Sequence, residues 1–400
     1  MKLAIAIPAL NEEDSITSIV ERSLAAREKI VAGTSVKEVE VIVVSDGSTD
    51  RTVERARAFG ERIKLVVFEK NRGYGAAIQE AWRQSDAELV GFLDADGTCD
   101  PEFFVVLCNR LLEEEADVSL GCRLNKASKM PPIRRLGNVL FALLLSLFSN
   151  QRVRDTASGM RVVRRSSLPR LLPLPTGMHF TPAMSARAIL SEDLKILESD
   201  MPYHEREGRS KLSVIRDGLR FLRVIVEAAF LYRPSRPLVL LGVAFGAAGA
   251  VLMVMPAVYY LRHHALQEWM IYRFVVSSLA ATSACLLVCT GYLAKKVVTI
   301  VISDRPESPV PRGVLGWFFG GWPWVAVAGL FVAGGALLVA PSFFELVRTG
   351  ATYEHWSRFI AMSTLVACAL TLAVTRVVDY TLDLIAARLA YFKSLAGGSG

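Results

Sequence analysis

Cysteine is scarce in this chain: six cysteines are scattered over 400 residues, and no two form a Cys-x-x-Cys pair. This usage argues against a disulfide framework and indicates a reducing compartment. Cys285 and Cys289 stand one helical turn apart inside an apolar run, which favours packing residues over metal ligands. A signal peptide is also lacking, because Met1–Ile5 leads directly into an apolar strand pattern.

Charge is missing from long stretches of the second half of the chain. The sequence is 52% hydrophobic with a mean hydropathy of +0.35, and this excess lies mainly between Leu238 and Val378. A helix needs about 20 apolar residues to cross a bilayer. Runs of that length in succession predict a multi-pass membrane domain rather than buried soluble helices. The expected spans are Leu238–Leu261, Phe274–Ala294, Trp322–Phe343 and Phe359–Val378.

The loops around these spans differ in lysine and arginine. The stretch before the first span, the second loop and the tail are rich in both, whereas the other loops hold mainly Arg262, Arg348 and Arg358. Basic loops stay in the cytosol, so we expect both termini and the N-terminal half there, in a bacterial inner membrane or its equivalent. Loops that face anionic lipid explain the net charge of +7, and nothing else suggests nucleic acid.

Two more segments indicate contact with the membrane surface. Between Leu212 and Tyr232, arginine alternates with apolar residues at helical spacing, as in a basic helix lying in the headgroup plane. The alternative is a charged helix packed on its own domain. Leu136–Ser149 is apolar but too short to span, and it follows two arginines. We expect an interfacial helix here, with a helix of the soluble core as the alternative.

The first 210 residues have the pattern of an α/β protein, in which strands alternate with helices. That order predicts a mostly parallel, Rossmann-like sheet with helices on both faces. No Gly-x-Gly-x-x-Gly follows the first strand, which argues against a dinucleotide-binding oxidoreductase. Strands are expected at Leu3–Ile7, Val39–Val44, Ile63–Phe68 and Leu89–Leu93, and helices at about Glu12–Ala32, Arg51–Phe59 and Tyr74–Arg83.

Ligands of such sheets bind beyond the carboxyl ends of the strands, so the loops after the strands carry the information. Asp94 and Asp96 follow the fourth strand, where both can approach one divalent cation. Asp46 follows the second strand and can accept hydrogen bonds from a base or a ribose. Asn71–Ala77 is a glycine-rich helix start that suits a diphosphate or a plain turn. Pro8–Asp14, after the first strand, suits a ligand or helix capping.

Together these loops resemble those of the family 2 glycosyltransferases of the GT-A fold, from Ile5 to about Leu212. The most similar branch glycosylates polyisoprenyl phosphates and is typified by dolichyl-phosphate mannose synthase. The resemblance implies Mg²⁺ or Mn²⁺ on Asp94 and Asp96, with Thr98 where the family often has a glutamine ligand. It implies a nucleotide site made of Pro8, Leu10, Asn11, Glu12, Asp46 and Asp94.

Further stretches are similar to the acceptor side of that family. Gly121-Cys122-Arg123 matches a Gly-Ser-Arg whose arginine meets the lipid phosphate, and Asp155–Arg161 matches an Asp-x-x-Ser-Gly-Phe-Arg segment. Arg206–Lys211 matches a basic loop near the membrane. The resemblance therefore implies catalysis by Asp94, Asp96, Arg123 and Arg134, and an acceptor phosphate held by Arg123, Arg134, Arg161, Arg206 and Lys211.

The implied activity is inverting transfer of a sugar from a UDP- or GDP-linked donor to a polyprenyl phosphate, dolichyl or undecaprenyl, in the bilayer. Phosphate is already an anion near neutral pH, so a strong general base is less necessary. A processive polysaccharide synthase is an alternative, but it usually carries Gln-x-x-Arg-Trp, which no glutamine here begins. A non-catalytic scaffold or flippase is another, but the spans carry few charges for a polar headgroup.

The expected organisation has four parts. A GT-A domain at residues 1–211 is followed by basic amphipathic helices at 212–236. A four-helix transmembrane domain follows at 237–394, and its helices could form a homo-oligomer. Residues 395–400 resemble a tag scar. The sugar, the base and the polyprenol length stay open.

Overall fold

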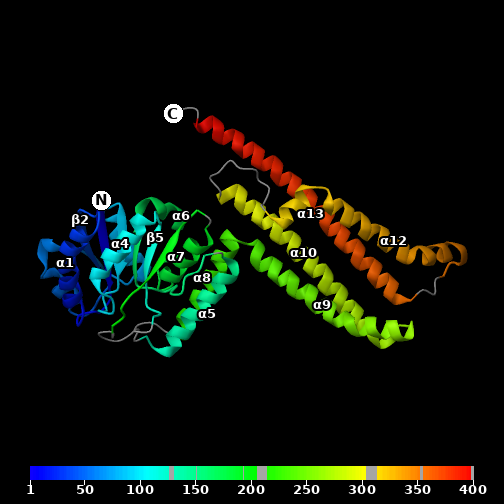
Figure 1. Ribbon diagram of the computed structural model, residues 1–400, viewed down its shortest axis with the longest axis horizontal. Helices are drawn as coiled ribbons and strands as arrows, with labels where there is room; N and C mark the ends of the chain where they lie inside the picture. The colour runs from blue at the N-terminus through cyan, green and yellow to red at the C-terminus, as the bar shows by residue number, and fades with distance from the viewer. Residues whose placement is uncertain are drawn as a thin grey trace. The chain divides into compact units, whose positions relative to one another are not determined.

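The computed structural model describes residues 1–125, 130–149, 151–191, 193–204, 214–302, 313–351 and 355–397. The chain divides into two compact units, Met1–Tyr232 and Arg233–Gly400. Figure 1 shows strands and helices mixed in the first unit and long helices in the second. The predicted loop of Arg206 and Lys211 lies outside the described residues.

The first unit is built on one mostly parallel sheet, as predicted. Short apolar runs form its strands, and every residue of β4 is buried. The strands are β1 (Lys2–Ala9), β2 (Glu38–Asp46), β3 (Lys64–Phe68), β4 (Leu89–Leu93), β5 (Val118–Cys122), β6 (Met160–Arg164) and β7 (Ile196–Asp200). The helices are α1 (Ile16–Gly33), α2 (Thr52–Arg57), α3 (Tyr74–Arg83), α4 (Phe104–Glu113), α5 (Pro132–Phe148), α6 (Leu168–Leu171), α7 (Phe180–Leu190) and α8 (Val214–Tyr232).

The strand order within the described residues is β3-β2-β1-β4-β6-β5-β7. Strands β1 to β4 run parallel, and β6 runs antiparallel to its neighbours β4 and β5. Helices cover both faces. Ile5, Ile7 and Phe104 pack on one side with α1 and α4, while Phe92 and Phe180 pack on the other with α3 and α7. The carboxyl ends of β1, β2 and β4 therefore meet at one edge of the sheet.

Helix α5 has two different faces. Asn138, Leu145 and Phe148 are buried against the first unit, and Phe141 packs edge-on against Phe221 of α8 at 5.9 Å. The opposite face leaves five apolar side chains between 53% and 61% exposed: Ile133, Leu136, Leu140, Leu143 and Leu147. The segment therefore has features of both predicted alternatives, because one stripe packs on the domain and the other is apolar but uncovered in this unit.

Helix α8 repeats this pattern. Phe221, Ile225 and Ala229 are buried, and the helix lies beside α5 and α7 (Figure 1). On another stripe, four apolar side chains are exposed to solvent in this unit: Leu219, Leu222, Val226 and Phe230. The helix thus packs on its own domain and still presents an apolar surface.

The second unit contains the helices predicted to cross a membrane. Within the described residues, four helical segments are long and apolar enough for that, which confirms the four predicted spans: Ser235–His263, Glu268–Val301, Pro323–Thr349 and Trp356–Phe392. They correspond to α9 (Ser235–His263), α10 (Ile271–Ile302), α12 (Pro323–Thr349) and α13 (Trp356–Gly397), and the short α11 (Val314–Gly320) precedes α12.

Helices α10 and α13 are joined by buried charges. Lys296, fully buried, contacts Asp379 and lies 2.8 Å from Asp383. The Tyr292 hydroxyl donates to Asp379 at 2.8 Å, and Arg376 also pairs with Asp379. A charge inside an apolar domain is retained where an opposite charge neutralises it. These charges therefore join α10 to α13.

Candidate active site

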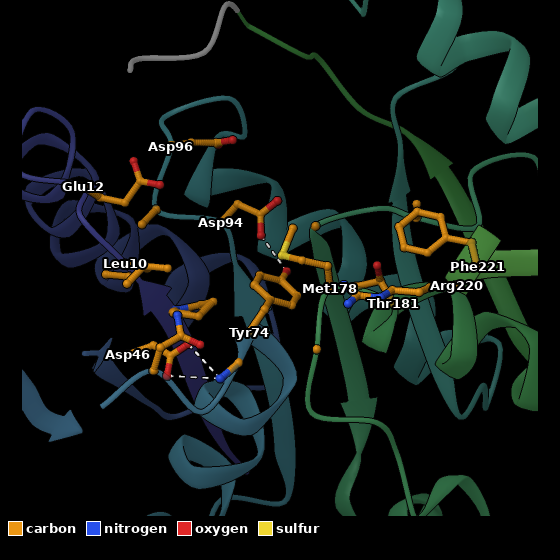
Figure 2. A pocket seen from close by; sticks show the side chains of 18 of the residues that line it. Leu10, Glu12, Asp46, Tyr74, Asp94, Asp96, Met178, Thr181, Arg220 and Phe221 are labelled. Atoms are coloured by element: carbon orange, nitrogen blue, oxygen red, sulfur yellow. Dashed lines mark hydrogen bonds between the residues drawn. The ribbon is translucent and has the colours of Figure 1, made fainter. Parts of the chain in front are cut away.

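A cavity of about 390 Å³ opens at the carboxyl ends of the strands of the first unit. Its lining joins three groups of side chains that are distant in the sequence (Figure 2). The carboxyl ends of β1 and β2 contribute Pro8 and Asp46, and the loop after β1 contributes Leu10 and Glu12. The loop after β4 contributes Asp94 and Asp96. The third group comprises Arg123, Arg134, Met178, Thr181, Tyr203, Arg220 and Phe221.

The two acids after β4 both line this cavity, as the sequence predicts. The Asp94 amide donates to the carbonyl of Gly159 at 3.2 Å, which continues the pairing of β4 with β6 by one residue. Tyr74 donates its hydroxyl to Oδ1 of Asp94 at 2.6 Å. The carboxylate of Asp96 is largely buried, at 6% residue exposure. The sheet edge thus carries two acids at the centre of the cavity.

Thr98 belongs to the turn that orients Asp96. Its amide and hydroxyl both donate to Oδ1 of Asp96, at 3.2 Å and 2.6 Å. The residue is 1% exposed and does not line the cavity. Thr98 therefore orients Asp96, and its place among the metal ligands, which the resemblance implies, stays a prediction.

Asp46 is held by the glycine-rich loop before α3. The amides of Arg72 and Gly73 donate to its carboxylate at 2.6 Å and 2.9 Å. Burial raises the pKa of Asp46, and these two hydrogen bonds act against that rise. The amides that the sequence suggested for a diphosphate are thus bonded to an acid of the neighbouring loop. The loop serves to orient Asp46.

Asn11 stands beside the cavity rather than in its lining. Its backbone has φ +48°, a left-handed conformation that asparagine tolerates better than most residues. Its side-chain oxygen accepts from the Thr49 amide at 2.8 Å. Asn11 therefore ties the first loop to the second, while Pro8, Leu10 and Glu12 face the cavity.

Arg123 is fixed by a buried acid. Its Nε and Nη2 donate to Asp155 at 2.7 Å and 2.9 Å, and its guanidinium lies 5.6 Å from the ring centroid of Tyr203. Burial alone would raise the pKa of Asp155, but the charge and hydrogen bonds of Arg123 outweigh it and hold that pKa below 3.8. Asn138 of α5 also donates to Asp155, at 3.1 Å. Arg123 reaches the cavity as a fully oriented cation.

Arg161 lies inside the domain instead of at the cavity. It is fully buried and donates to the carbonyls of Ser158 and Thr156 at 3.2 Å and 2.9 Å. Burial lowers the pKa of its guanidinium to about 10. Arg161 thus lies near enough to Asp155, Arg123 and Asp94 for their charges to interact. It does not line the cavity, because strand β6 turns its side chain into the core, and its role at the acceptor phosphate stays a prediction.

Sequence reasoning missed several residues that line the cavity. Tyr74 follows the glycine-rich loop, whose pattern suggested a diphosphate site or a plain turn. Arg220 and Phe221 belong to α8, whose arginines were interpreted as facing lipid, and Figure 2 shows them across the cavity from Glu12 and Leu10. Only the basic, apolar spacing of α8 could have suggested them, since their approach depends on packing of α8 against α7.

A mostly parallel sheet with paired acids at the end of β4 and arginines opposite them is the arrangement of a GT-A-like domain. The family model for "Glycosyl transferase family 2" matches residues 4–172. The chain is 33% identical over 257 residues to the low-salt glycan biosynthesis hexosyltransferase Agl6 of Haloferax volcanii, covering 63% of this chain and 59% of that protein. It is 34% identical over 231 residues to the dolichyl-phosphate hexose transferase of the same organism, and the match covers 56% of this chain and 92% of that protein.

A solved structure is also similar, the glucosyl-3-phosphoglycerate synthase of Mycobacterium tuberculosis in complex with Mn²⁺, uridine diphosphate and phosphoglyceric acid. The identity is 21% and the TM-score 0.46, with 57% of this chain and 78% of that chain covered. This likeness is too low to bear on the ligands of the present chain. The match to the hexose transferase, which is covered almost throughout, shows the family. The chain belongs to glycosyltransferase family 2, and the resemblance seen in the sequence is confirmed.

Proposed function

We propose that this protein transfers a sugar, with inversion, from a nucleotide-diphospho-sugar to a membrane polyprenyl phosphate, giving a polyprenyl-phosphate-linked monosaccharide. The curated relatives include a dolichyl-phosphate hexose transferase and a dodecaprenyl-phosphate galacturonate synthase of Rhizobium johnstonii. The donor carries uridine or guanosine diphosphate. This diphosphate is the leaving group, and Mg²⁺ or Mn²⁺ would assist its departure.

One observation carries this proposal: a single cavity has acids at its centre and cations on the side of α5 and α8. Figure 2 shows Asp94 between Asp46 and Arg220, and Asp96 and Arg123 line the same cavity. The Asp46 side suits the hydroxyl and N–H groups of a nucleoside, which donate to a carboxylate. The arginine side suits a phosphate, which arginine can bind with two parallel hydrogen bonds. The donor diphosphate and the acceptor phosphate are both anions and repel each other. Arginines beside the acceptor phosphate and a cation on the acids would each reduce that repulsion.

The proposed reaction needs no group to accept a proton, because the attacking phosphate oxygen is already an anion. An oxygen of the acceptor phosphate attacks C1 of the sugar, and the new C1–O bond forms as the bond from C1 to the diphosphate breaks. The electron pair leaves with the nucleoside diphosphate. Arg123 and Arg134 hold the attacking phosphate, while Asp46 and the first loop hold the donor. In-line attack from the opposite face inverts the anomeric centre.

Two carboxylates at one strand end fit a hard divalent ion, since Mg²⁺ and Mn²⁺ prefer oxygen ligands. Among the described residues, no group of three histidine, cysteine or acidic side chains is suited to a metal. Asp94 and Asp96 would therefore hold the ion together with oxygens of the diphosphate, as is common for ions bound with a nucleotide. When bound, the ion stabilises the negative charge of the departing diphosphate.

The membrane-facing features support the lipid acceptor. The second unit has helices fit to span a bilayer, and α5 and α8 expose apolar side chains beside Arg134 and Arg220 of the cavity. An apolar helix face flanked by arginine suits the boundary between headgroups and acyl chains. The content of lysine and arginine in the loops supports a cytosolic first unit and cytosolic termini.

Transfer of labelled sugar into lipid tests this function. Thermal shift with Mn²⁺ and a panel of UDP- and GDP-linked sugars first selects the donor. The full chain in liposomes with undecaprenyl or dolichyl phosphate should then form labelled monomeric lipid in a metal-dependent reaction. Long labelled polymer would indicate a processive synthase instead. No transfer with any donor that binds would indicate a scaffold.

Arg220 should contribute to acceptor binding. It lines the cavity and donates to Asp217 at 3.1 Å, so its guanidinium is partly oriented by its own helix. We expect Arg220→Gln to raise the KM for polyprenyl phosphate about tenfold, because a charge-assisted hydrogen bond is worth about 1.5–3 kcal/mol and the side chain is half exposed. The KM for the donor should stay the same.

Steady-state kinetics with each substrate varied in turn measures this effect. Arg216→Gln is the matched control. Arg216 also belongs to α8 and is exposed, but it does not line the cavity. A higher KM for acceptor in both variants would point to general attraction of anionic lipid. An unchanged KM in Arg220→Gln would remove that arginine from the acceptor site.

A further inference from the structure

Tyr74, the first residue of α3, reaches the first of the two acids. Its hydroxyl donates to Oδ1 of Asp94 at 2.6 Å, and Figure 2 shows the hydroxyl end of the ring pointing to that carboxylate in the cavity lining. A hydrogen bond to a charged carboxylate is stronger than one between two neutral groups. Neither the acid pair nor the glycine-rich pattern in the sequence indicates this contact.

The ring of Tyr74 is held by aromatic neighbours. It packs edge-on against Phe92 of β4, with ring centroids 6.4 Å apart, and against Phe180 of α7, also at 6.4 Å. Edge-to-face contacts of this kind stabilise the position of a ring beyond the effect of its buried area. Since Phe92 lies two residues before Asp94 on the same strand, the hydroxyl is fixed relative to the acid that it contacts.

The backbone before Tyr74 is equally constrained. Gly73 has φ +105°, and a Cβ at this position would lie 2.4 Å from the carbonyl oxygen of Thr176. The Ala76 amide donates to the same carbonyl at 3.0 Å. The start of α3 is thus bonded to the loop before α7, and the tyrosine has little freedom to move.

The other oxygen of Asp94 lies close to Gly159, the residue before β6. A Cβ at Gly159 would lie 1.8 Å from Oδ2 of Asp94, so a side chain there would displace the carboxylate. The Asp94 amide donates to the Gly159 carbonyl, which keeps the two residues together. Tyr74 therefore holds one oxygen of Asp94, and the absence of a side chain at Gly159 leaves room for the other.

We infer that Tyr74 is a positioning residue whose hydroxyl sets the rotation of the Asp94 carboxylate toward the divalent ion. The terminal torsion of an aspartate is broad, so an acid without this bond samples several orientations. Groups that bind a reacting charge act best when they are oriented before it arrives. This inference rests on the proposed metal-assisted transfer and adds a residue that governs it.

Tyr74→Phe tests the inference because it removes the hydroxyl and keeps the ring against Phe92 and Phe180. In the full chain, we expect Mn²⁺ affinity at saturating UDP, or GDP in a parallel titration, to fall about tenfold, which corresponds to roughly 1.4 kcal/mol. Nucleotide affinity in EDTA should equal that of the wild type, and a thermal melt should show that the protein remains folded, with at most a modest loss of Tm. Electron paramagnetic resonance of free Mn²⁺ measures the affinity, and kcat should fall by a similar factor.

Tyr232→Phe is the matched control, since Tyr232 donates its hydroxyl to the Arg170 carbonyl at 3.2 Å and does not line the cavity. It should change neither affinity. Gly159→Ala should weaken Mn²⁺ binding from the opposite side of Asp94.

Wild-type Mn²⁺ affinity in Tyr74→Phe would overturn the inference. An equal loss of metal-free nucleotide affinity would also overturn it, since that result indicates general packing. If the wild type transfers no sugar to lipid while Tyr74→Phe still weakens Mn²⁺ binding, the proposed function fails and the role of Tyr74 stands.

Discussion

Asp96→Asn should lower sugar transfer about a thousandfold while the protein stays folded. Asp96 lines the centre of the cavity, and the variant removes a negative charge that the divalent ion requires. Stabilisation of the leaving diphosphate by such an ion is worth several kcal/mol, and about 4 kcal/mol corresponds to this loss in rate. The asparagine oxygen can still accept from the amide and hydroxyl of Thr98, so the turn after β4 is expected to persist.

Initial rates at saturating donor and acceptor, with Tm measured alongside, check this result. Asp86→Asn is the control, because Asp86 is an exposed acid that pairs only at the surface with Lys2. It should leave both rate and Tm unchanged. Transfer by Asp96→Asn within tenfold of the wild type would refute the metal assignment.

Asp155→Asn should destabilise the first unit strongly. Asp155 is fully buried and pairs with Arg123 through two hydrogen bonds. Removing the charge of one partner of a buried pair costs about 3–5 kcal/mol, because the other charge is left without compensation. For a domain of this size, that cost lowers Tm by roughly 6–20 °C. The variant should also lose acceptor affinity, since Arg123 would no longer be oriented.

The full-length protein in detergent serves for this measurement, with Glu114→Gln as the control. Glu114 pairs with Arg110 at 2.7 Å on the surface, and surface pairs contribute about 0–1 kcal/mol. An Asp155→Asn variant as stable as this control would show that the buried pair does not hold the acceptor side together.

The effect of Asp155 should depend on pH. Its pKa in the folded protein lies below 3.8, its ordinary value. An acid with a lowered pKa stabilises the fold above the unfolded pKa, and this contribution is lost as the pH falls through the folded value. The difference in Tm between the wild type and Asp155→Asn should therefore be full near pH 7 and shrink below about pH 3.8. A constant difference down to pH 3 would contradict the assignment.

The elements that hold the site could be predicted from the sequence because each has a local cause. The run Leu89–Leu93 is β4 without a change of bounds, since a buried strand needs only a short apolar segment. The start of α3 at Tyr74 follows from Gly73, which precedes it. The spans follow from length and hydropathy alone. The position of Asp94 and Asp96 at a strand end needed no knowledge of the rest of the fold.

The partners across the cavity could not be predicted in this way. Arg123 and Asp155 are 32 residues apart, and Tyr74 and Asp94 are 20 apart, so neither contact follows from a helical or strand period. Arg161 shares a motif with Asp155, yet β6 turns it into the core. Arg220 looked like one of many lipid-facing arginines until the packing of α8 brought it to the cavity.

The sequence alone determined which residues can do chemistry here: paired acids at a strand end, polar loops after parallel strands and long uncharged helices. These features are set by composition and period over a few residues, where local physics is enough. Only the tertiary structure decided which arginines reach the cavity, which are used in the core, and that a tyrosine holds the first acid. Such choices depend on how α5, α7 and α8 pack on the sheet, and packing is a property of contacts between distant segments.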